Sequence, residues 1–191
     1  MLRRDALVAA VQRLPTQPLE GVAFRLILAR YAATALSSIG SLRAGGRYNP
    51  RGRFEALYLA SSPVTALREV EVLVETTDGL RGVKGPPRIL LSVEYRLQPV
   101  VDLTNAAVHE ALGTTLDELC APWRPLNAAG QVAPTQLLGE IIHDDGRIEA
   151  LRVPSARDPS TDNLVILPDR LRAGSALRVF DDSGLIDAHL P

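Results

Sequence analysis

A glycine-rich stretch of the sequence, GGRYNPRG, carries residue types suited to binding phosphate groups. It spans residues 45–52 and includes Arg47 and Arg51. Guanidinium groups bind phosphates and carboxylates through paired hydrogen bonds, and the backbone N–H groups of a tight turn can supply further donors. The stretch has neither the spacing of a Walker loop nor that of a dinucleotide-binding glycine fingerprint. On its own it fits an ordinary hairpin or loop as well as a phosphate site.

Three further side chains are candidates for chemistry, and each also has a structural explanation. Glu69 lies on the flank of a predicted helix, between its apolar face and its charged face, where a carboxylate can face a cleft. Tyr58 lies in the strand-like run LYLA, where tyrosines are commonly half-buried in the core. Ser155 follows a predicted strand directly, at a position typical of a turn.

The composition limits the classes of function that the chain can have. With 191 residues, of which 46% are hydrophobic, the chain is long enough for one domain with a sizeable core. A net charge of −1 and an aromatic content of 4% argue against a surface built for nucleic acid, although four arginines gather in and around the glycine-rich stretch. Such an arginine-rich loop could still bind a partner.

The sequence predicts neither a metal site nor a membrane segment. Cys120 is the only cysteine, and His109, His143 and His189 lie far apart, so no metal-ligand spacing occurs. No apolar run reaches the roughly 20 residues that cross a bilayer, and the N-terminal stretch is too polar for a signal peptide. A serine hydrolase is not indicated, because no G-x-S-x-G motif is present. We expect a soluble, cytoplasmic protein.

Hydrophobic periodicity predicts strands and helices without a regular βαβ alternation, which favours an α+β fold. Ser62 and Pro63 form a good helix start, a hydroxyl cap followed by proline in the first turn, and Thr104 is a second candidate cap. The glycine- and serine-rich segment 33–52 is predicted as a loop. Helices are predicted at 7–14, 64–75, 116–123 and 134–142, and strands at 22–29, 56–60, 88–97, 100–103, 147–155, 163–168 and 176–180.

Taken together, these pieces resemble the RES-domain family, the toxin half of RES–Xre toxin–antitoxin pairs. Each motif alone is weak, but the set occurs in the family's order and spans about 24–168. Tyr48 replaces the usual tryptophan, and Phe24 stands where tyrosine is frequent. The matching pieces are FRL (Phe24, Arg25), GGRYNPRG, YLASS (Tyr58 to Ser62), ALREV (Glu69) and PSARDPSTDNLVILP (Ser155, Asn163).

The resemblance implies a single α+β domain similar to the ADP-ribosyltransferase fold, with central antiparallel or mixed β-strands flanked by helices. It divides the chain into an N-terminal helix and lead-in (1–20), an NAD-consuming RES domain (21–170) and a C-terminal strand and tail of the same domain (171–191). The implied activity is depletion of cellular NAD⁺ through cleavage of its nicotinamide–ribose bond, by phosphorolysis or hydrolysis. Two alternatives stay open: ADP-ribosylation of a host protein at the same site, and a non-catalytic, arginine-rich interaction module.

The resemblance also implies roles for individual residues. Arg47 and Arg25 would bind the phosphates of NAD⁺, and Tyr58 with Tyr48 would stack on or orient its nicotinamide end. Glu69 would bind a ribose hydroxyl and stabilise positive charge on the ribose, while Ser155 would bind the substrate or order its loop. The predicted catalytic set is Arg47, Tyr58, Glu69 and Ser155, and the predicted substrate-binding set is Arg25, Arg47, Tyr48 and Tyr58.

NAD⁺ is expected as a substrate rather than a cofactor, with inorganic phosphate as a possible co-substrate. The expected protein partner is an antitoxin with an Xre-type helix-turn-helix, joined to this chain in a hetero-oligomeric complex. DNA contact would then come only through that antitoxin, in keeping with the near-neutral charge of this chain.

Overall fold

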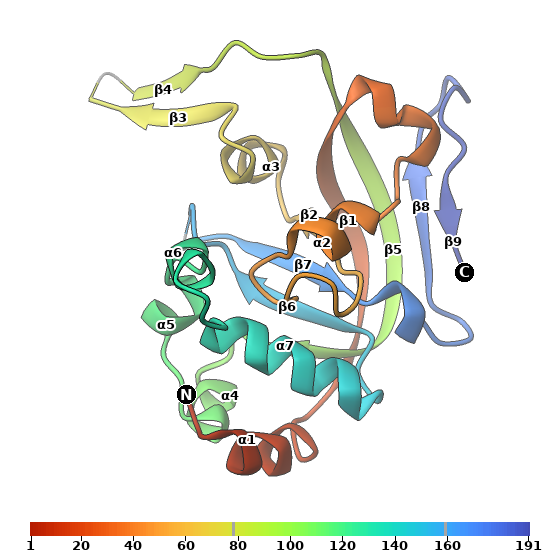
Figure 1. Ribbon diagram of the computed structural model, residues 1–191. Coiled ribbons are helices and arrows are strands. Elements are labelled where there is room, and N and C mark those ends of the chain that lie inside the picture. Colours follow the sequence, from red (N-terminus) through yellow and green to blue (C-terminus); the bar gives the residue numbers. More distant parts are fainter. Residues whose placement is uncertain (78, 159) are drawn as a thin grey trace.

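The computed structural model describes residues 1–77, 79–158 and 160–191, and within them a mixed sheet forms the centre of the fold (Figure 1). The strand order is β1-β2-β7-β6-β5-β8-β9, and β1 also pairs with β5, so five of the strands close into a ring. Pairings are antiparallel except that between β5 and β6. The strands are β1 (Gln17–Leu28), β2 (Leu57–Ala60), β5 (Arg88–Asp102), β6 (Ala150–Pro154), β7 (Asp162–Ile166), β8 (Ala176–Phe180) and β9 (His189–Leu190).

Helices flank this sheet in two groups, so the chain is a single mixed α/β domain. One group lies on the side of α7 in Figure 1 and comprises α1 (Arg4–Val11), α4 (Ala106–Leu112), α5 (Leu116–Cys120), α6 (Arg124–Ala128) and α7 (Pro134–Asp145). The other elements are η1 (Ala29–Thr34), α2 (Ile39–Ala44), α3 (Pro63–Glu69), a hairpin of β3 (Leu73–Thr76) and β4 (Gly79–Gly82), and η2 (Pro168–Arg170). In Figure 1 the hairpin projects beyond α3, away from α7.

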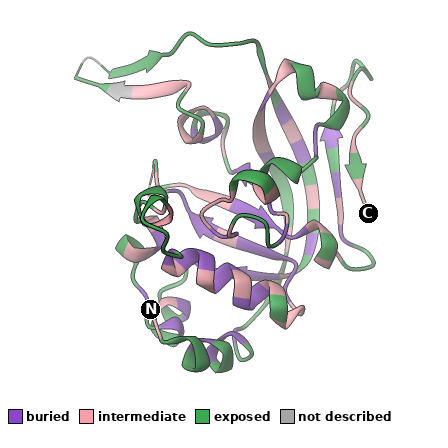
Figure 2. Cartoon of the chain, viewed as in Figure 1, coloured by how far each residue is buried: buried purple, intermediate pink, exposed green. Residues whose placement is uncertain are grey.

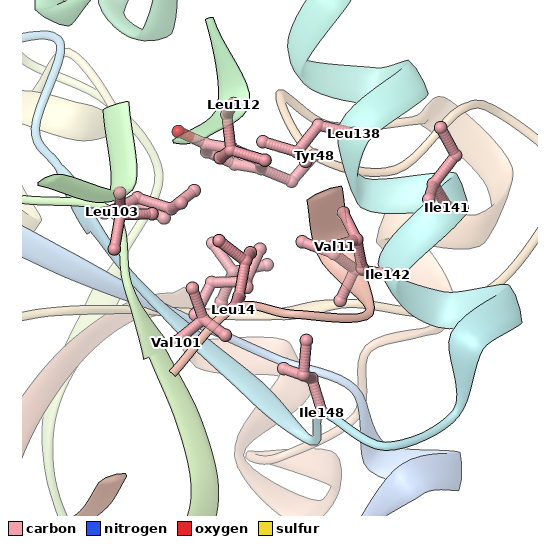
Figure 3. Close-up of a cluster of buried hydrophobic side chains, with 14 of the residues drawn as sticks. Val11, Leu14, Tyr48, Val101, Leu103, Leu112, Leu138, Ile141, Ile142 and Ile148 are labelled. Atoms are coloured by element: carbon pink, nitrogen blue, oxygen red, sulfur yellow. The ribbon is translucent and has the colours of Figure 1, made fainter. Parts of the chain in front are cut away.

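Two hydrophobic cores result from the alternation of side chains along the strands. On β6 and β7, Leu151 and Val165 face the helices, whereas Ala150 and Ile166 face the interior of the ring. Figure 2 shows that buried residues recur along α7, as expected for a helix with one buried face. Figure 3 shows the core beneath the helices, which includes Val11, Leu14, Tyr48, Val101, Leu103, Leu112, Leu138, Ile141, Ile142 and Ile148.

The predicted start of α3 is confirmed, but its predicted end is wrong. The Ser62 hydroxyl accepts a hydrogen bond from the Thr65 N–H, and Pro63 is the first helical residue. The helix was predicted to run to residue 75, yet it ends at Glu69, and Glu71 has a φ of 57°. The β-branched residues that follow favour extended structure, and residues 73–76 pair with β4 instead. Glu69 is therefore at the C-terminal end of a short helix.

Further differences from the predictions concern a loop, a strand boundary and a helix cap. Segment 33–52, predicted as a loop, contains the end of η1 and all of α2 before the glycine-rich turn. The strands predicted at 88–97 and 100–103 form one strand, β5, because β1 pairs with it from Arg88 to Val100 and β6 continues the pairing to Asp102. Asn105, not Thr104, caps α4, with its side chain accepting the Ala107 N–H.

Candidate active site

A cavity of about 780 Å³ opens where β1, the glycine-rich turn, α3 and the ends of β6 and β7 meet. This volume is typical of a small-molecule site. It brings together residues that lie far apart in the sequence, among them Arg25, Arg47, Tyr48, Tyr58, Glu69, Cys120, Trp123, Arg124, Arg157 and Asn163. All the predicted site residues except Ser155 line it, and Ser155 lies directly behind its wall.

Glu69, at the end of α3, presents a carboxylate to this cavity with one oxygen already bonded. Its Oε1 accepts hydrogen bonds from the Ser155 hydroxyl and from the Asn163 side-chain amide, both at 2.7 Å. Two donors on one oxygen fix the carboxylate and leave Oε2 for another partner. The Asn163 Oδ1 is buried and has no hydrogen-bond partner among the described residues.

Ser155 orders a loop as well as Glu69. Its side chain is fully buried, and its Oγ accepts the backbone N–H groups of Arg157 and Asp158, both at 3.2 Å. Because the same hydroxyl donates to Glu69, it couples the turn after β6 to the end of α3. The structure thus favours the loop-ordering role for Ser155 over direct contact with a ligand.

Two ion pairs reinforce that coupling from either side of Glu69. Arg68, one residue before it, pairs with Asp158, and Glu71, two residues after it, pairs with Arg157. Pro159 in the same loop lies outside the described residues. The hydrogen bonds and ion pairs together hold the end of α3 and the loop from 155 to 158 in one arrangement.

Arg47 is held by carbonyl groups rather than by a carboxylate. Its Nη1 donates to the Leu119 carbonyl at 3.3 Å and to the Ala121 carbonyl. Among the described residues no ion pair involves Arg47, so its charge is not neutralised by a neighbouring carboxylate. An arginine in this state is well suited to bind an anion.

Arg25, on β1, is anchored in the same way. Its Nη1 and Nη2 donate to the carbonyls of Ala35 and Ser37, both at 2.8 Å. Burial lowers the pKa of Arg25 to about 10, which still leaves the guanidinium charged at neutral pH. The structure therefore places a second positively charged side chain in the cavity wall.

The cavity is positive although the whole chain is not. Four arginines and two glutamates line it, a balance of two positive charges, whereas the chain carries a net charge of −1. One of these glutamates, Glu71, is already paired with Arg157. Concentrating one sign of charge in a concave site attracts ligands of the opposite sign.

Tyr58 supports the glycine-rich turn with its hydroxyl. The hydroxyl donates to Asn49 Oδ1 at 2.8 Å and accepts the Tyr48 N–H at 3.0 Å. Burial raises the pKa of the Tyr58 hydroxyl far above its usual value. A β-carbon on Gly46 would lie 2.4 Å from this hydroxyl, so the turn requires glycine at that position. The Tyr58 hydroxyl is thus committed to the turn that carries Arg47.

Tyr48 does not present its ring to the cavity as predicted. Its side chain is 1% exposed and packs in the core with Leu112 and Leu138 (Figure 3). Burial raises the pKa of its hydroxyl strongly, and that hydroxyl has no partner among the described residues. The turn directs the Tyr48 ring toward α7 and the core, an arrangement that does not favour the predicted stacking role.

Sequence reasoning assigned no role to three residues that the structure brings to the site. Asn163 bonds Glu69, Asn49 organises the turn through Tyr58, and Trp123 lines the cavity. Both asparagines lie within the motifs quoted for the family resemblance, so those motifs could have pointed to them as site residues. No motif could have pointed to Trp123, because its segment matches none of them.

Two further observations concern metals and membranes. No cluster of three or more histidine, cysteine, aspartate or glutamate side chains suited to a metal ion occurs in the described part of the chain. Within the same residues, no helix has both the length and the apolar character needed to cross a bilayer.

Comparison with known proteins places this architecture in one family. Proteins named NAD(+) phosphorylase MbcT from Mycobacterium bovis and Mycobacterium tuberculosis are 33% identical to the chain over 107 residues, which is 52% of this chain and 54% of each relative. The chain therefore spans about half the length of the curated relatives it matches. The crystal structure of the M. tuberculosis MbcT–MbcA toxin–antitoxin complex is similar with a TM-score of 0.70 and 24% identity, covering 93% of this chain and 90% of that one. The family model described as the RES domain matches residues 22–187, so this chain belongs to the RES domain family.

Proposed function

We propose that this chain is the toxin of a toxin–antitoxin pair and that it cleaves the nicotinamide–ribose bond of NAD⁺ with inorganic phosphate. The observation that carries the proposal is the Glu69 carboxylate, which Ser155 and Asn163 hold at the wall of a positively charged cavity. The name of the mycobacterial relatives, NAD(+) phosphorylase, supports the same reaction.

The proposed reaction needs charge stabilisation more than proton transfer. When the bond between ribose C1′ and the pyridinium nitrogen breaks, its electron pair stays on the nitrogen and nicotinamide leaves as a neutral molecule. The ribose then carries oxocarbenium-like positive charge until a phosphate oxygen bonds to C1′ and gives ADP-ribose phosphorylated at that carbon. A fixed carboxylate stabilises such a cation best when it requires no reorganisation during the reaction.

Every predicted site residue except Tyr48 has a part in this proposal. Glu69 Oε2 would bind a ribose hydroxyl and stabilise the cation, while Ser155 holds Glu69 in place. Arg47 and Arg25 would bind the pyrophosphate and the attacking phosphate, because neither is neutralised by a carboxylate among the described residues. Tyr58 would act indirectly, by supporting the turn that carries Arg47. NAD⁺ is thus a substrate, and the reaction as written uses no bound cofactor.

The proposal extends to fold ancestry, partner and location. The ring of strands with a glutamate at its rim would correspond to an ADP-ribosyltransferase-like core. The partner would be an Xre-type helix-turn-helix antitoxin whose C-terminal segment blocks the cavity, and DNA would be contacted only through it. Toxin and antitoxin would form a hetero-oligomer in the cytoplasm. The match to a toxin–antitoxin complex supports an antitoxin partner.

Product identification tests the proposed reaction. The chain, purified free of any antitoxin, is incubated with NAD⁺ with and without inorganic phosphate, and the products are identified by mass. We expect nicotinamide and phosphorylated ADP-ribose, formed only when phosphate is present. Phosphate-independent loss of NAD⁺ would replace phosphorolysis by hydrolysis, and ADP-ribose attached to an added cell lysate protein would favour the transferase alternative. Intact NAD⁺ under every condition would leave the interaction-module alternative.

A further inference from the structure

The cavity wall also includes a tryptophan and an arginine that no proposed step has used. Trp123 is the only tryptophan of the chain, and it precedes α6 at the cavity wall. The Arg124 guanidinium lies over the indole ring, with its Cζ 4.7 Å from the ring centroid. Both residues line the cavity, and no ion pair of the described residues involves Arg124. We refer to these two side chains as the Trp123–Arg124 stack.

The segment that leads to this stack passes the other parts of the site in order. The Cys120 thiol lies 3.8 Å from the carbonyl of Ser155, whose side chain holds Glu69. The next residue, Ala121, accepts a hydrogen bond from the Arg47 guanidinium. Trp123 follows two residues later. The segment therefore contacts first the loop that holds Glu69 and then the arginine proposed for the phosphates, and it next places Trp123 at the cavity wall.

This order matches the order of groups in a dinucleotide. Three residues of extended chain span at most roughly 10 Å, comparable with the ribose–pyrophosphate–ribose unit that separates the two bases of NAD⁺. If the nicotinamide ribose lies at Glu69 and the pyrophosphate at Arg47, the remaining adenosine reaches the vicinity of Trp123. Purine bases stack on tryptophan rings and on arginine planes, which makes this surface chemically suited to adenine.

We propose that the Trp123–Arg124 stack is the adenine-binding subsite of the cavity. The proposal rests on the proposed function, because it takes NAD⁺ as the substrate. It assigns Trp123 and Arg124 a role in recognising the unreactive end of that substrate. Binding there affects the affinity for NAD⁺ and leaves the chemistry at Glu69 unchanged.

The single tryptophan allows a binding test that needs no catalysis. Tryptophan fluorescence, excited at a wavelength where adenine does not absorb, is followed during titration with AMP and, as the matched control, with ribose 5-phosphate. We expect saturable quenching by AMP and none by ribose 5-phosphate, since only AMP carries a base. The Arg124→Ala variant should weaken AMP binding severalfold. Equal quenching by both compounds, or by neither, overturns the proposal.

Kinetics provide the second measurement. Replacing Trp123 by Ala should raise the KM for NAD⁺ at least about fivefold, the lower end of the effect measured for base stacking, with kcat within twofold. Trp123→Phe, which retains an aromatic face, should recover most of the loss. An unchanged KM in the Ala variant, or a fall in kcat alone, contradicts the proposal. Circular dichroism of each variant checks folding, and the Phe variant keeps the test decisive if the Ala variant misfolds.

The two proposals fail in different ways. If the wild-type chain leaves NAD⁺ intact while AMP still quenches Trp123 selectively, the reaction is wrong and the purine subsite stands. If NAD⁺ is cleaved but AMP has no selective effect, the subsite is wrong and the reaction stands. A surface that instead contacts a protein partner would bind neither AMP nor ribose 5-phosphate.

Discussion

Replacing Tyr58 by Phe separates the support of the glycine-rich turn from the chemistry of the site. The change removes one hydroxyl and keeps the ring in the core. That hydroxyl accepts the Tyr48 N–H at 3.0 Å and donates to Asn49 Oδ1 at 2.8 Å, and Asn49 is fully buried. The variant therefore loses two hydrogen bonds. The Tyr48 N–H is left without its acceptor, and Asn49 Oδ1 is left without its donor.

The expected loss of stability follows from these two contacts. A buried polar group left without its partner costs about 1–3 kcal/mol. The variant leaves two such groups, because both are bonded to the one hydroxyl of Tyr58. We expect the free energy of unfolding to fall by about 2–4 kcal/mol. For a chain of this length, each 1 kcal/mol corresponds to roughly 2–4 °C in Tm. The measurement is thermal and urea unfolding of wild type and variant.

A matched control and a kinetic readout make this prediction decisive. Tyr31 is half exposed, and Tyr31→Phe should leave the unfolding free energy within about 0.5 kcal/mol. Because the turn carries Arg47, the Tyr58 variant should raise the KM for NAD⁺. Unchanged stability combined with a large loss of kcat would refute our reasoning, since it would mean that the Tyr58 hydroxyl acts on the substrate.

Two further predictions concern the packing around the same turn. Tyr48→Phe should stabilise the fold by about 1 kcal/mol in urea unfolding, because it removes a buried hydroxyl that has no partner among the described residues. Burial raises the pKa of Tyr48, so this residue gives the free energy of unfolding no pH dependence below pH 10 and lowers it above pH 10 by about 1.4 kcal/mol per pH unit. The Phe variant should lose that part of the alkaline slope, and an identical slope would contradict the assignment. Gly139→Ala should destabilise the fold by at least about 2 kcal/mol, since the new Cβ would lie 1.7 Å from the Tyr48 carbonyl oxygen. Gly40→Ala, in α2 with no atom within 4 Å, should instead gain up to about 1 kcal/mol from helix propensity, and similar effects of the two changes would be inconsistent with this packing.

Local signals in the sequence were sufficient for the start of α3 but not for its end. Ser62 and Pro63 act within one turn, so their effect can be predicted from neighbours alone. The end of the helix depends on the pairing of residues 73–76 with β4, a tertiary contact that overrides the helical periodicity. Glu69 was nevertheless expected at a cleft, because its place on the helix flank holds for either length.

The roles of the two tyrosines could not be distinguished from the sequence. Tyr58 lies on a strand, where alternation directs it toward the core beneath the helices. Tyr48 lies in an irregular turn, whose side-chain directions depend on contacts such as that of the turn with Gly139 on α7. Partners of Glu69 that lie more than 80 positions away, Ser155 and Asn163, become neighbours only when β7 pairs with both β2 and β6.

The most direct test of the account compares one isosteric change at Glu69 with the same change elsewhere. Glu69→Gln removes the negative charge and keeps the shape of the side chain, whereas Glu94→Gln alters an exposed glutamate on β5 outside the cavity. Phosphate-dependent release of nicotinamide from NAD⁺ is measured for both variants and for wild type, with circular dichroism confirming the fold. We predict a loss of at least about a hundredfold in kcat for Glu69→Gln, the scale seen when a charge-stabilising group is removed, and wild-type activity for Glu94→Gln. Full activity of a folded Glu69→Gln variant would contradict the central claim that this carboxylate stabilises the cation.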